Sequence, residues 1–335
     1  QRLWYIRAKQ VVISSGSIER PIVFGNNDTP GVVLASAAKE YMKVYGVLVG
    51  KKPVVFTNND SAYETAIEFK KNNINPIVLD SRQDSNSEII KEAKSLGIDI
   101  KFSHVVVAAK GYKKVKSCDI AEISEDKQNL NQIKNIECDC ICVSGFWTPT
   151  IHLASQSGGK TKFKEEIDAF VPDKSKQKEV TLGSANGVFT LEETLKTSFD
   201  KGFELSKAIT NNNNSQQIPK VSEKKHSKHD KFWCVPLPKG KKYKRFLDFQ
   251  NDVAVSDIEL AIREGYRSIE HVKRYTTLGM ATDQGKTSNL NGLQLVSNIE
   301  NKVVPAVGHT TFRPPYTPIS IGAIVGREIG KHSKP

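Results

Sequence analysis

The clearest pattern of hydrophobic and polar positions lies between residues 53 and 80, where it predicts a strand, a turn, a helix and a second strand. Residues 53–56 are apolar, residues 57–61 are polar, and apolar side chains return at helical spacing at positions 62, 66, 67 and 69. A second apolar run, residues 77–79, ends in Asp80. This is the order of a dinucleotide-binding βαβ unit, in which an acidic residue about 20 positions beyond the turn holds a ribose hydroxyl.

The turn of this unit lacks the glycines that allow a backbone to approach a pyrophosphate. The fingerprint would stand at residues 57–62, where the sequence reads Thr-Asn-Asn-Asp-Ser-Ala. Asparagine adopts left-handed backbone conformations, but Asp60 would repel a phosphate at the helix N-terminus. A degenerate, empty nucleotide fold is therefore expected at least as readily as an occupied one.

Apolar runs on both sides of this unit predict further strands. Residues 3–7 alternate as in a strand, and residues 10–13 run into Ser14, Ser15 and Gly16. Strands are also expected at residues 99–102, 105–109 and 140–144, the last closing at Gly145. Two apolar strands that end in small-residue turns are typical of a chain that crosses between two nucleotide-type domains.

Residues 181–189 form a second turn rich in small residues, Thr-Leu-Gly-Ser-Ala-Asn-Gly-Val-Phe, and a helical pattern follows from Thr190 to Ile209. Small residues before a helix N-terminus allow close approach of a cofactor phosphate or ribose. A tight turn needs the same residues, so both interpretations stay open here.

The net charge of +12 at pH 7 is concentrated in one segment. Residues 220–245 hold ten lysines and arginines against two acids, and they follow an Asn/Gln-rich stretch at 211–217. A basic run without interleaved aromatic residues is more typical of a solvated linker than of a nucleic-acid surface. His226 and His229 are expected to be solvated. A basic nucleic-acid-binding protein remains a hypothesis, which a steep salt dependence of DNA binding would support.

A compact helical unit is predicted after this segment. Residues 256–259, Ser-Asp-Ile-Glu, resemble a capping box that opens a helix ending at Gly265, and Ser268 caps a second helix through Tyr275. A DNA-reading helix-turn-helix is the alternative, but the elaborate loop at 275–289 disfavours it. Residues 285–287, Gly-Lys-Thr, resemble the end of a phosphate-binding loop, yet Met280 stands where its first glycine belongs, which disfavours a nucleoside triphosphatase.

Composition excludes a membrane-spanning protein and favours a cytoplasmic one. Hydrophobic residues make up 38% of the 335 residues and charged residues 26%, and no apolar run approaches the roughly 18 residues of a spanning helix. Cys138, Cys140 and Cys142 alternate, so a strand would place them on one face as small buried residues of a reducing compartment. Metal ligation is not expected, because no C-x-x-C spacing occurs.

Four segments of this chain carry a resemblance to the alpha subunits of heterotetrameric sarcosine oxidases and of related amine, opine and proline dehydrogenases. They are residues 8–21, residues 54–63, residues 249–253, and residues 271–289 together with 312–318. The resemblance implies an α/β fold with two dinucleotide-binding-type domains of the disulfide-reductase kind, the first incomplete, followed by a small helical ferredoxin-like module. Because only Cys234 is present in that module, we expect no iron-sulfur cluster there.

The resemblance also implies a division of the chain and its cofactors. Residues 1–50 and 146–210 would form the first domain, 51–145 an inserted second domain, 211–231 a linker, 232–300 the helical module, and 301–335 a linker toward a folate-binding domain. We expect a fragment, with the first βαβ unit before Gln1. In such enzymes the alpha subunit binds NAD, FMN lies at the alpha/beta interface, FAD is held by beta, tetrahydrofolate binds the C-terminal domain of alpha, and gamma and delta subunits complete the assembly.

The reaction implied is the oxidative demethylation of sarcosine to glycine with oxygen and tetrahydrofolate. An opine, proline or amine dehydrogenase subunit is the alternative. No catalytic constellation of Ser, His and Asp or of paired carboxylates emerges from the sequence, which agrees with chemistry on a partner subunit. Two sets of contacts are implied by position: for NAD, Ser15, Gly16, Gly183, Ser184, Ala185, Gly187, Phe189 and Leu191; for the flavin interface, Arg274, Thr276, Thr277, Gln284, Gly285, Lys286 and Thr287.

Overall fold

A parallel five-stranded sheet forms the largest ordered unit of the protein. The computed structural model describes residues 2–210, 217–221 and 228–325. The strand order is β3 (Val32–Leu34), β10 (Cys140–Ser144), β4 (Pro53–Thr57), β5 (Ile77–Asp80) and β6 (Asp99–Phe102). Strands β4 and β10 are buried along their whole lengths, as expected for apolar runs covered on both faces of a parallel sheet.

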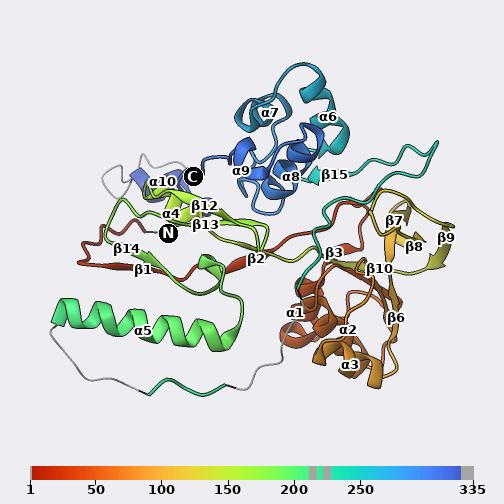
Figure 1. The fold of residues 1–335 in the computed structure, drawn as a ribbon, viewed down its shortest axis with the longest axis horizontal. Helices are drawn as coiled ribbons and strands as arrows, with labels where there is room; N and C mark the ends of the chain where they lie inside the picture. Colours follow the sequence, from red (N-terminus) through yellow and green to blue (C-terminus); the bar gives the residue numbers. More distant parts are fainter. Residues whose placement is uncertain (1, 211–216, 222–227, 326–335) are drawn as a thin grey trace.

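The two faces of this sheet are covered by different layers (Figure 1). Helices α1 (Ala35–Tyr45), α2 (Ser61–Lys71) and α3 (Glu88–Ser95) pack on the face that carries Val55. The antiparallel strands β7 (His104–Gly111), β8 (Val115–Glu122) and β9 (Lys134–Glu137) lie toward the opposite face, which carries Val54 and Phe56. Alternate residues of β4 thus pack into two separate hydrophobic cores, one on each face of the sheet.

The strands predicted at 99–102 and 140–144 are confirmed at both ends. The strand predicted at 105–109 is also present, but β7 begins one residue earlier and ends two residues later. The expectation that three cysteines share one strand face is wrong. Strand β10 begins at Cys140, so Cys138 precedes it and packs in the core beside Cys118, whereas Cys140 and Cys142 pack under the helices. All are buried free thiols.

A second unit is built from short strand pairs and contains both the beginning of the chain and the segment after β10. Its pairs are β1 (Val11–Ile13) with β14 (Glu179–Thr181), β2 (Ser17–Glu19) with β11 (Trp147–Pro149), and β12 (Thr161–Lys164) with β13 (Ala169–Pro172). Helix α4 (His152–Gln156), the short 3-10 helix η1 (Gly183–Asn186) and helix α5 (Leu191–Thr210) complete it. The helix predicted from Thr190 to Ile209 is therefore confirmed.

The strand predicted at residues 3–7 is wrong. No pairing partner lies beside these residues in the described structure, and Tyr5 is 92% exposed. Alternation of apolar and polar residues predicts a strand only where a neighbouring strand can accept its hydrogen bonds.

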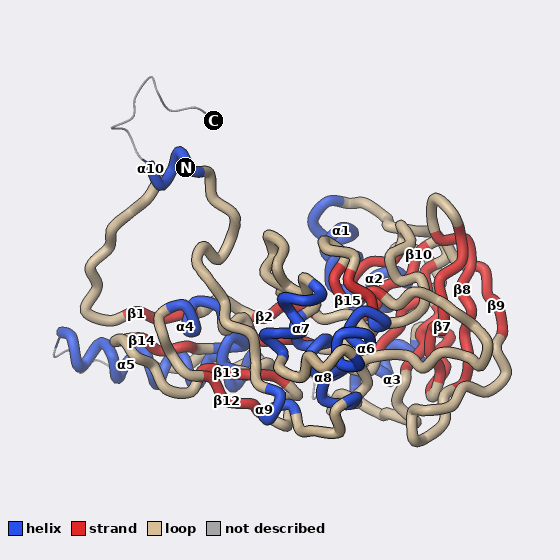
Figure 2. Tube along the Cα trace, turned by 90° about the horizontal axis from the view of Figure 1, so that it is seen from above, coloured by secondary structure: helices blue, strands red, loops and turns tan. Residues whose placement is uncertain are grey.

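A helical unit follows residue 245 and lies beside the other two units (Figures 1 and 2). It begins with the hairpin of β15 (Phe246–Asp248) and β16 (Val253–Ala254) and continues through α6 (Val255–Arg263), α7 (Ile269–Thr276), α8 (Asn289–Ile299) and α9 (Val304–Val307). The short helix α10 (Ile321–Val325) lies apart from these helices (Figures 1 and 2). The capping box predicted at residues 256–259 is not formed. Helix α6 begins two residues earlier than that box implies, and the Ala254 N–H donates to the carboxylate of Asp257 at 2.8 Å, but the alanine side chain cannot accept a hydrogen bond in return. Ser268 is the N-cap of α7, although its side chain makes no capping hydrogen bond.

Candidate functional site

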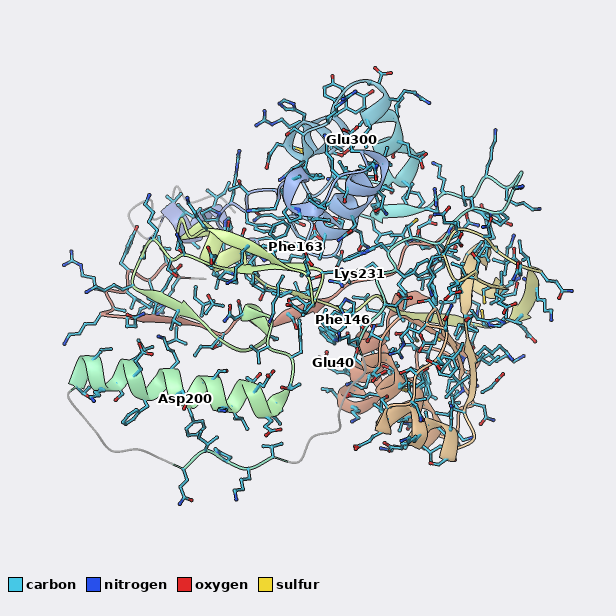
Figure 3. All side chains as sticks on the ribbon, in the orientation of Figure 1. Glu40, Phe146, Phe163, Asp200, Lys231 and Glu300 are labelled. Carbon is cyan, nitrogen blue, oxygen red and sulfur yellow. The ribbon has the colours of Figure 1, made fainter. Side chains whose placement is uncertain are left out.

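A large cleft lies where the five-stranded sheet meets the second unit. It has a volume of about 750 Å³ and opens at the carboxyl ends of β3, β4 and β10. Ligands of open α/β sheets bind outside these strand ends. Phe146, at the end of β10, lies at this junction (Figure 3). The lining residues are Ser17, Glu19, Ser36, Lys39, Asn59, Asp60, Ser61, Glu64, Thr65, Phe146, Trp147, Glu166, Ser184, Phe189, Thr190, Glu193, Lys228 and His229.

The two small-residue turns whose residues the resemblance implies as NAD contacts, 14–17 and 183–187, are brought together. Ile13 pairs with Thr181, and the Leu182 N–H donates to the Ile13 carbonyl at 2.9 Å. Thr150 fixes the first turn, because its hydroxyl donates to the Gly16 carbonyl at 2.6 Å and the Ser15 hydroxyl donates to the Thr150 carbonyl at 3.0 Å. Ser15, Gly16 and the 183–187 turn therefore belong to one module.

The residues implied as NAD contacts divide into cleft-lining and packing positions. Ser184 and Phe189 line the cleft. Ala185 is buried, and a Cβ on Gly187 would approach Ile167 and Val171 at 2.8 and 2.9 Å, so Gly187 is required for packing and for its φ of +72°. Gly16 and Gly183 also have positive φ, and Leu191 is exposed at the start of α5.

The predicted turn of the inserted βαβ unit is occupied by side chains of the protein itself. Arg82 donates to Asp60 at 2.8 Å and to Asp80 at 2.7 Å, and the Tyr63 hydroxyl donates to Asp80 at 2.7 Å. Burial and the carboxylate of Asp80 raise the pKa of Tyr63. Burial opposes the charge of Arg82, but the two carboxylates outweigh it and raise its pKa. Asp80 is therefore engaged by protein donors at the position where the pattern places a ribose contact.

A segment at residues 228–232, which we call the strap, lies over the same sheet edge. The Asn58 side chain donates to the Asp230 carbonyl at 2.7 Å, and the Asp230 N–H donates to the Asn58 carbonyl at 2.9 Å. Lys127 binds the Asp230 carboxylate at 2.9 Å. The strap occupies the backbone and side chain of Asn58, and Arg82 and Tyr63 occupy the carboxylates of Asp60 and Asp80. The residues present therefore do not fit a dinucleotide whose pyrophosphate lies on this turn and whose ribose is held by Asp80.

The expectation that His229 is solvated is wrong, and His226 lies outside the described residues. The His229 side chain is 6% exposed, its Nε2 lies 3.0 Å from Asp168, and its ring stacks on Phe146 with 4.1 Å between centroids. Burial alone would raise the pKa of Asp168, but hydrogen bonds with His229 and Lys231 lower it. The pattern of the linker could not reveal this contact, because Asp168 lies 61 residues away.

Two buried charges beside the cleft were not identified from the sequence. Arg20 is 2% exposed, its Nε donates to the Gly145 carbonyl at 2.7 Å, and its guanidinium lies 4.2 Å from the Trp233 ring centroid. Glu19 accepts from the Ser36 N–H at 2.8 Å and from its hydroxyl at 2.6 Å. Burial raises the pKa of Glu19. The run Glu19-Arg20-Pro21 was the available signal, since two charges beside a strand core need buried partners.

The charge of the cleft favours some ligand groups over others. Five acidic residues line it, but Asp60 pairs with Arg82 and Glu64 pairs with Lys39. This leaves Glu19, Glu166 and Glu193 against Lys228. An acidic lining disfavours phosphates and suits sugar hydroxyls or a cationic ring. The cleft is therefore matched to the ribose and ring portions of a dinucleotide better than to its pyrophosphate.

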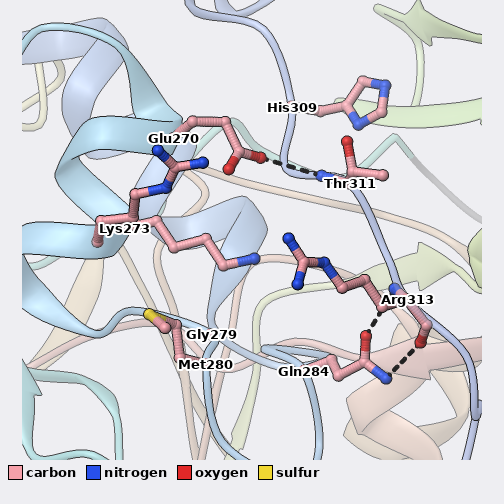
Figure 4. Close-up of a pocket in the computed structure, with 9 residues that line it drawn as sticks. Glu270, Lys273, Gly279, Met280, Gln284, His309, Thr311 and Arg313 are labelled. Carbon is pink, nitrogen blue, oxygen red and sulfur yellow. Dashed lines mark hydrogen bonds between the residues drawn. The ribbon is translucent and has the colours of Figure 1, made fainter.

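The residues implied at the flavin interface lie in the helical unit, and two of them line a second pocket of about 600 Å³ (Figure 4). These are Arg274 and Gln284. Thr276 donates to the Val272 carbonyl at 2.8 Å, Thr277 has a φ of +65°, and Thr287 borders a separate apolar pocket.

Lys286 and Gly285 serve the packing of this loop. The Lys286 ammonium donates to the Tyr316 carbonyl at 2.9 Å and lies 3.9 Å from the Tyr316 ring centroid, and a Cβ on Gly285 would approach Asn289 Oδ1 at 2.2 Å. Beside them the His152 ring lies against the Phe312 ring, tilted by 44°, with 3.9 Å between the centroids. Burial and the charge of Lys286 lower the pKa of His152 to about 4.

Neither a helix long and apolar enough for a bilayer nor a group of three or more His, Cys, Asp or Glu side chains suited to a metal ion occurs within residues 2–210, 217–221 and 228–325.

Comparisons with known proteins agree with this architecture. Residues 242–327 match the family model described as the sarcosine oxidase A3 domain. The chain is 35% identical, over 99% of its length, to a protein named sarcosine oxidase subunit alpha from Corynebacterium sp. (strain P-1), and 36% identical, over 100% of its length, to the subunit of that name from Rhizobium meliloti (strain 1021). It spans 35% and 33% of these relatives' own lengths.

Among solved structures, L-proline dehydrogenase from P. horikoshii has a TM-score of 0.67 at 21% identity, covering 95% of this chain and 58% of that one. This likeness concerns the α/β fold alone. The 35–36% identity to the two named alpha subunits along nearly the whole chain is more specific than the likeness in fold. The chain is therefore similar to sarcosine oxidase alpha subunits along nearly its whole length, and it spans about a third of theirs.

Proposed function

We propose that this chain provides the NAD-binding scaffold and the flavin-facing loop of a sarcosine oxidase alpha subunit. The whole enzyme would convert sarcosine to glycine with oxygen and tetrahydrofolate. It would hold FAD on its beta subunit, FMN at the alpha/beta interface and tetrahydrofolate on a further domain of the alpha subunit, and gamma and delta subunits would complete it. The observation that carries this proposal is the 34–36% identity to named alpha subunits over nearly the whole chain.

The 750 Å³ cleft is the proposed NAD site. Its volume falls within the roughly 300–1,000 Å³ of small-molecule sites. Ser184, Phe189 and Trp147 line it from the second unit. Its acidic side chains would accept hydrogen bonds from ribose hydroxyls and would attract the cationic nicotinamide ring. Ser15, Gly16, Gly183, Ala185, Gly187 and Leu191 would shape the turns around it rather than supply side-chain contacts.

NAD titration of the full chain tests this site. We expect NAD to quench the fluorescence of Trp147, because the indole borders the cleft. A bulky Ser184→Tyr substitution would fill the site and weaken NAD binding about tenfold or more, equivalent to about 1.4 kcal/mol or more. Ser206→Tyr on exposed α5 is the matched control and should bind normally. Equal affinity of the Ser184→Tyr and Ser206→Tyr variants would refute the site.

Reconstitution tests the subunit assignment separately. The complete alpha subunit that contains this sequence, combined with beta, gamma and delta subunits and with FAD, FMN and NAD, should consume oxygen when sarcosine is added. Proline or an opine should be tested as the competing substrates. Oxygen consumption or dye reduction with those substrates, and none with sarcosine, would replace the sarcosine assignment.

A further inference from the structure

Three cationic side chains converge on the second pocket, between α7 and the segment at residues 309–313. Lys273 and Arg274 come from α7, and Arg313 comes from the segment that follows α9. His309 also lines the pocket. Figure 4 shows the side chains of Lys273 and Arg313 extending toward one another. Like charges that approach each other raise the energy of the empty pocket.

These charges are poorly balanced by the protein. No ion pair within 4.0 Å involves Lys273, Arg274 or Arg313 in the part of the chain that the structure describes. Glu270 is the acidic residue that lines the pocket, and its carboxylate accepts the Thr311 N–H at 3.2 Å. Burial lowers the pKa of Lys273, and Arg313 and Arg274 lower it further against the attraction of Glu270.

The backbone that presents Arg313 is fixed, so the pocket is formed before any ligand arrives. The Arg313 N–H donates to Gln284 Oε1 at 2.9 Å, and Gln284 Nε2 donates to the Arg313 carbonyl at 2.8 Å. These bonds use the backbone of Arg313 and leave its guanidinium available to the pocket. A site whose donors are already positioned loses little conformational entropy on binding.

We propose that this pocket binds the phosphate of a nucleotide-sized phosphate monoester. Two or more convergent cations match the charge of a phosphate dianion, and a guanidinium matches its oxygens with two parallel hydrogen bonds. The volume of about 600 Å³ is far larger than a phosphate, so the anion is one end of a larger molecule. The inference rests on the proposed function only in its choice of flavin mononucleotide as the first ligand to test, because Arg274 and Gln284 belong to the proposed flavin-facing loop.

Calorimetric titrations of the full chain at low salt test the proposal with inorganic phosphate, flavin mononucleotide, adenosine monophosphate and riboflavin. Phosphate and at least one of the two monoesters should bind and compete with each other, whereas riboflavin should not bind. Lys273→Gln and Arg313→Gln should each weaken binding about tenfold or more, since each removes a charged hydrogen bond. Lys201→Gln on exposed α5 is the matched control and should change nothing.

The outcomes separate this inference from the proposed function. Binding of phosphate and adenosine monophosphate but not of flavin mononucleotide supports the pocket and contradicts the flavin assignment. No phosphate binding, or equal binding by Arg313→Gln and Lys201→Gln, overturns the pocket, while the NAD titration of the cleft is unaffected. Circular dichroism confirms folding of each variant, and Arg313→Gln keeps the backbone bonds to Gln284.

Discussion

Replacing Arg82 by alanine tests whether the closed edge of the inserted domain is held by charge. Arg82 donates to two carboxylates at once, and the side chains of Arg82, Asp60 and Asp80 are 7%, 1% and 0% exposed. Arg82 also donates to the carbonyl of Lys228 in the strap at 3.4 Å. The substitution would therefore remove the cation shared by two buried carboxylates and one of the bonds to the strap.

We expect a large loss of local stability, because water cannot replace the guanidinium at these positions without opening the structure. Removing one partner of a buried ion pair costs about 3–5 kcal/mol, whereas an exposed pair contributes about 0–1 kcal/mol. A loss of about 3–5 kcal/mol raises the opening equilibrium of this domain by about 150- to 5,000-fold. Arg82→Lys should fall between, since a single ammonium keeps the charge and loses the fork that reaches both carboxylates.

Amide hydrogen exchange measures this opening locally, which suits a molecule built of several units. Exchange in β4, β5 and the strap should accelerate in Arg82→Ala, and exchange in α8 should not. Lys101→Ala is the matched control, because it breaks an exposed ion pair with Asp99. The side chain of Lys101 is 38% exposed and that of Asp99 is 54% exposed. Protection in β4 and β5 that changes by less than about 1 kcal/mol, as expected for the control, would refute the reasoning.

Three further predictions concern single residues. Gly187→Ala should lower the free energy of unfolding by about 1–3 kcal/mol, because the positive φ and the close packing both oppose a Cβ. Gly202→Ala within α5 should raise it by about 0.5–1 kcal/mol, because a Cβ there meets nothing within 4 Å. Urea denaturation measures both free energies, and equal effects would contradict the packing argument. Hydrogen bonds with His229 and Lys231 lower the pKa of Asp168, so its stabilisation is present above the unfolded carboxyl pKa of about 3.9 and is lost as the pH falls through the lower folded pKa. Asp168→Asn should be less stable at neutral pH and should lose less stability on acidification below about pH 4 in thermal melts. The unfolded state protonates His152 near pH 6.5 and the folded state only near pH 4, so the free energy of unfolding should decrease as the pH is lowered from 6.5 to 4. His152→Phe should abolish this part of the pH dependence. An unchanged slope would show that His152 is not the group responsible.

The residues that the resemblance implies as cofactor contacts have two kinds of surroundings in the structure. Ser184 and Phe189 line the cleft, whereas Gly187 and Lys286 are explained by packing within the protein. Sequence spacing identifies a turn or a loop. Whether a glycine in it admits a ligand or a neighbouring side chain depends on what lies opposite.

The sequence by itself determined the local elements of this protein. The run of residues 53–80 specifies strand, helix and strand because the apolar spacing changes from continuous to helical and back, and residues 140–144 are apolar enough to specify a strand buried on both faces. The long helix after residue 190 is likewise a matter of local spacing. Such patterns depend on neighbours within about two helical turns, so no distant residue is needed to predict them.

Only the tertiary structure decided which distant residues meet. The pairing of β1 with β14 joins positions about 170 residues apart, His229 finds Asp168 across 61 residues, and the cations of the second pocket come from α7 and from a segment some 40 residues later. The first contact completes a pair of strands and the second balances a charge, which one segment cannot do alone, whereas the third gathers like charges around one pocket. A charge in the sequence shows that a partner is needed, but the partner is set by how the units pack, and that depends on the whole core rather than on local spacing.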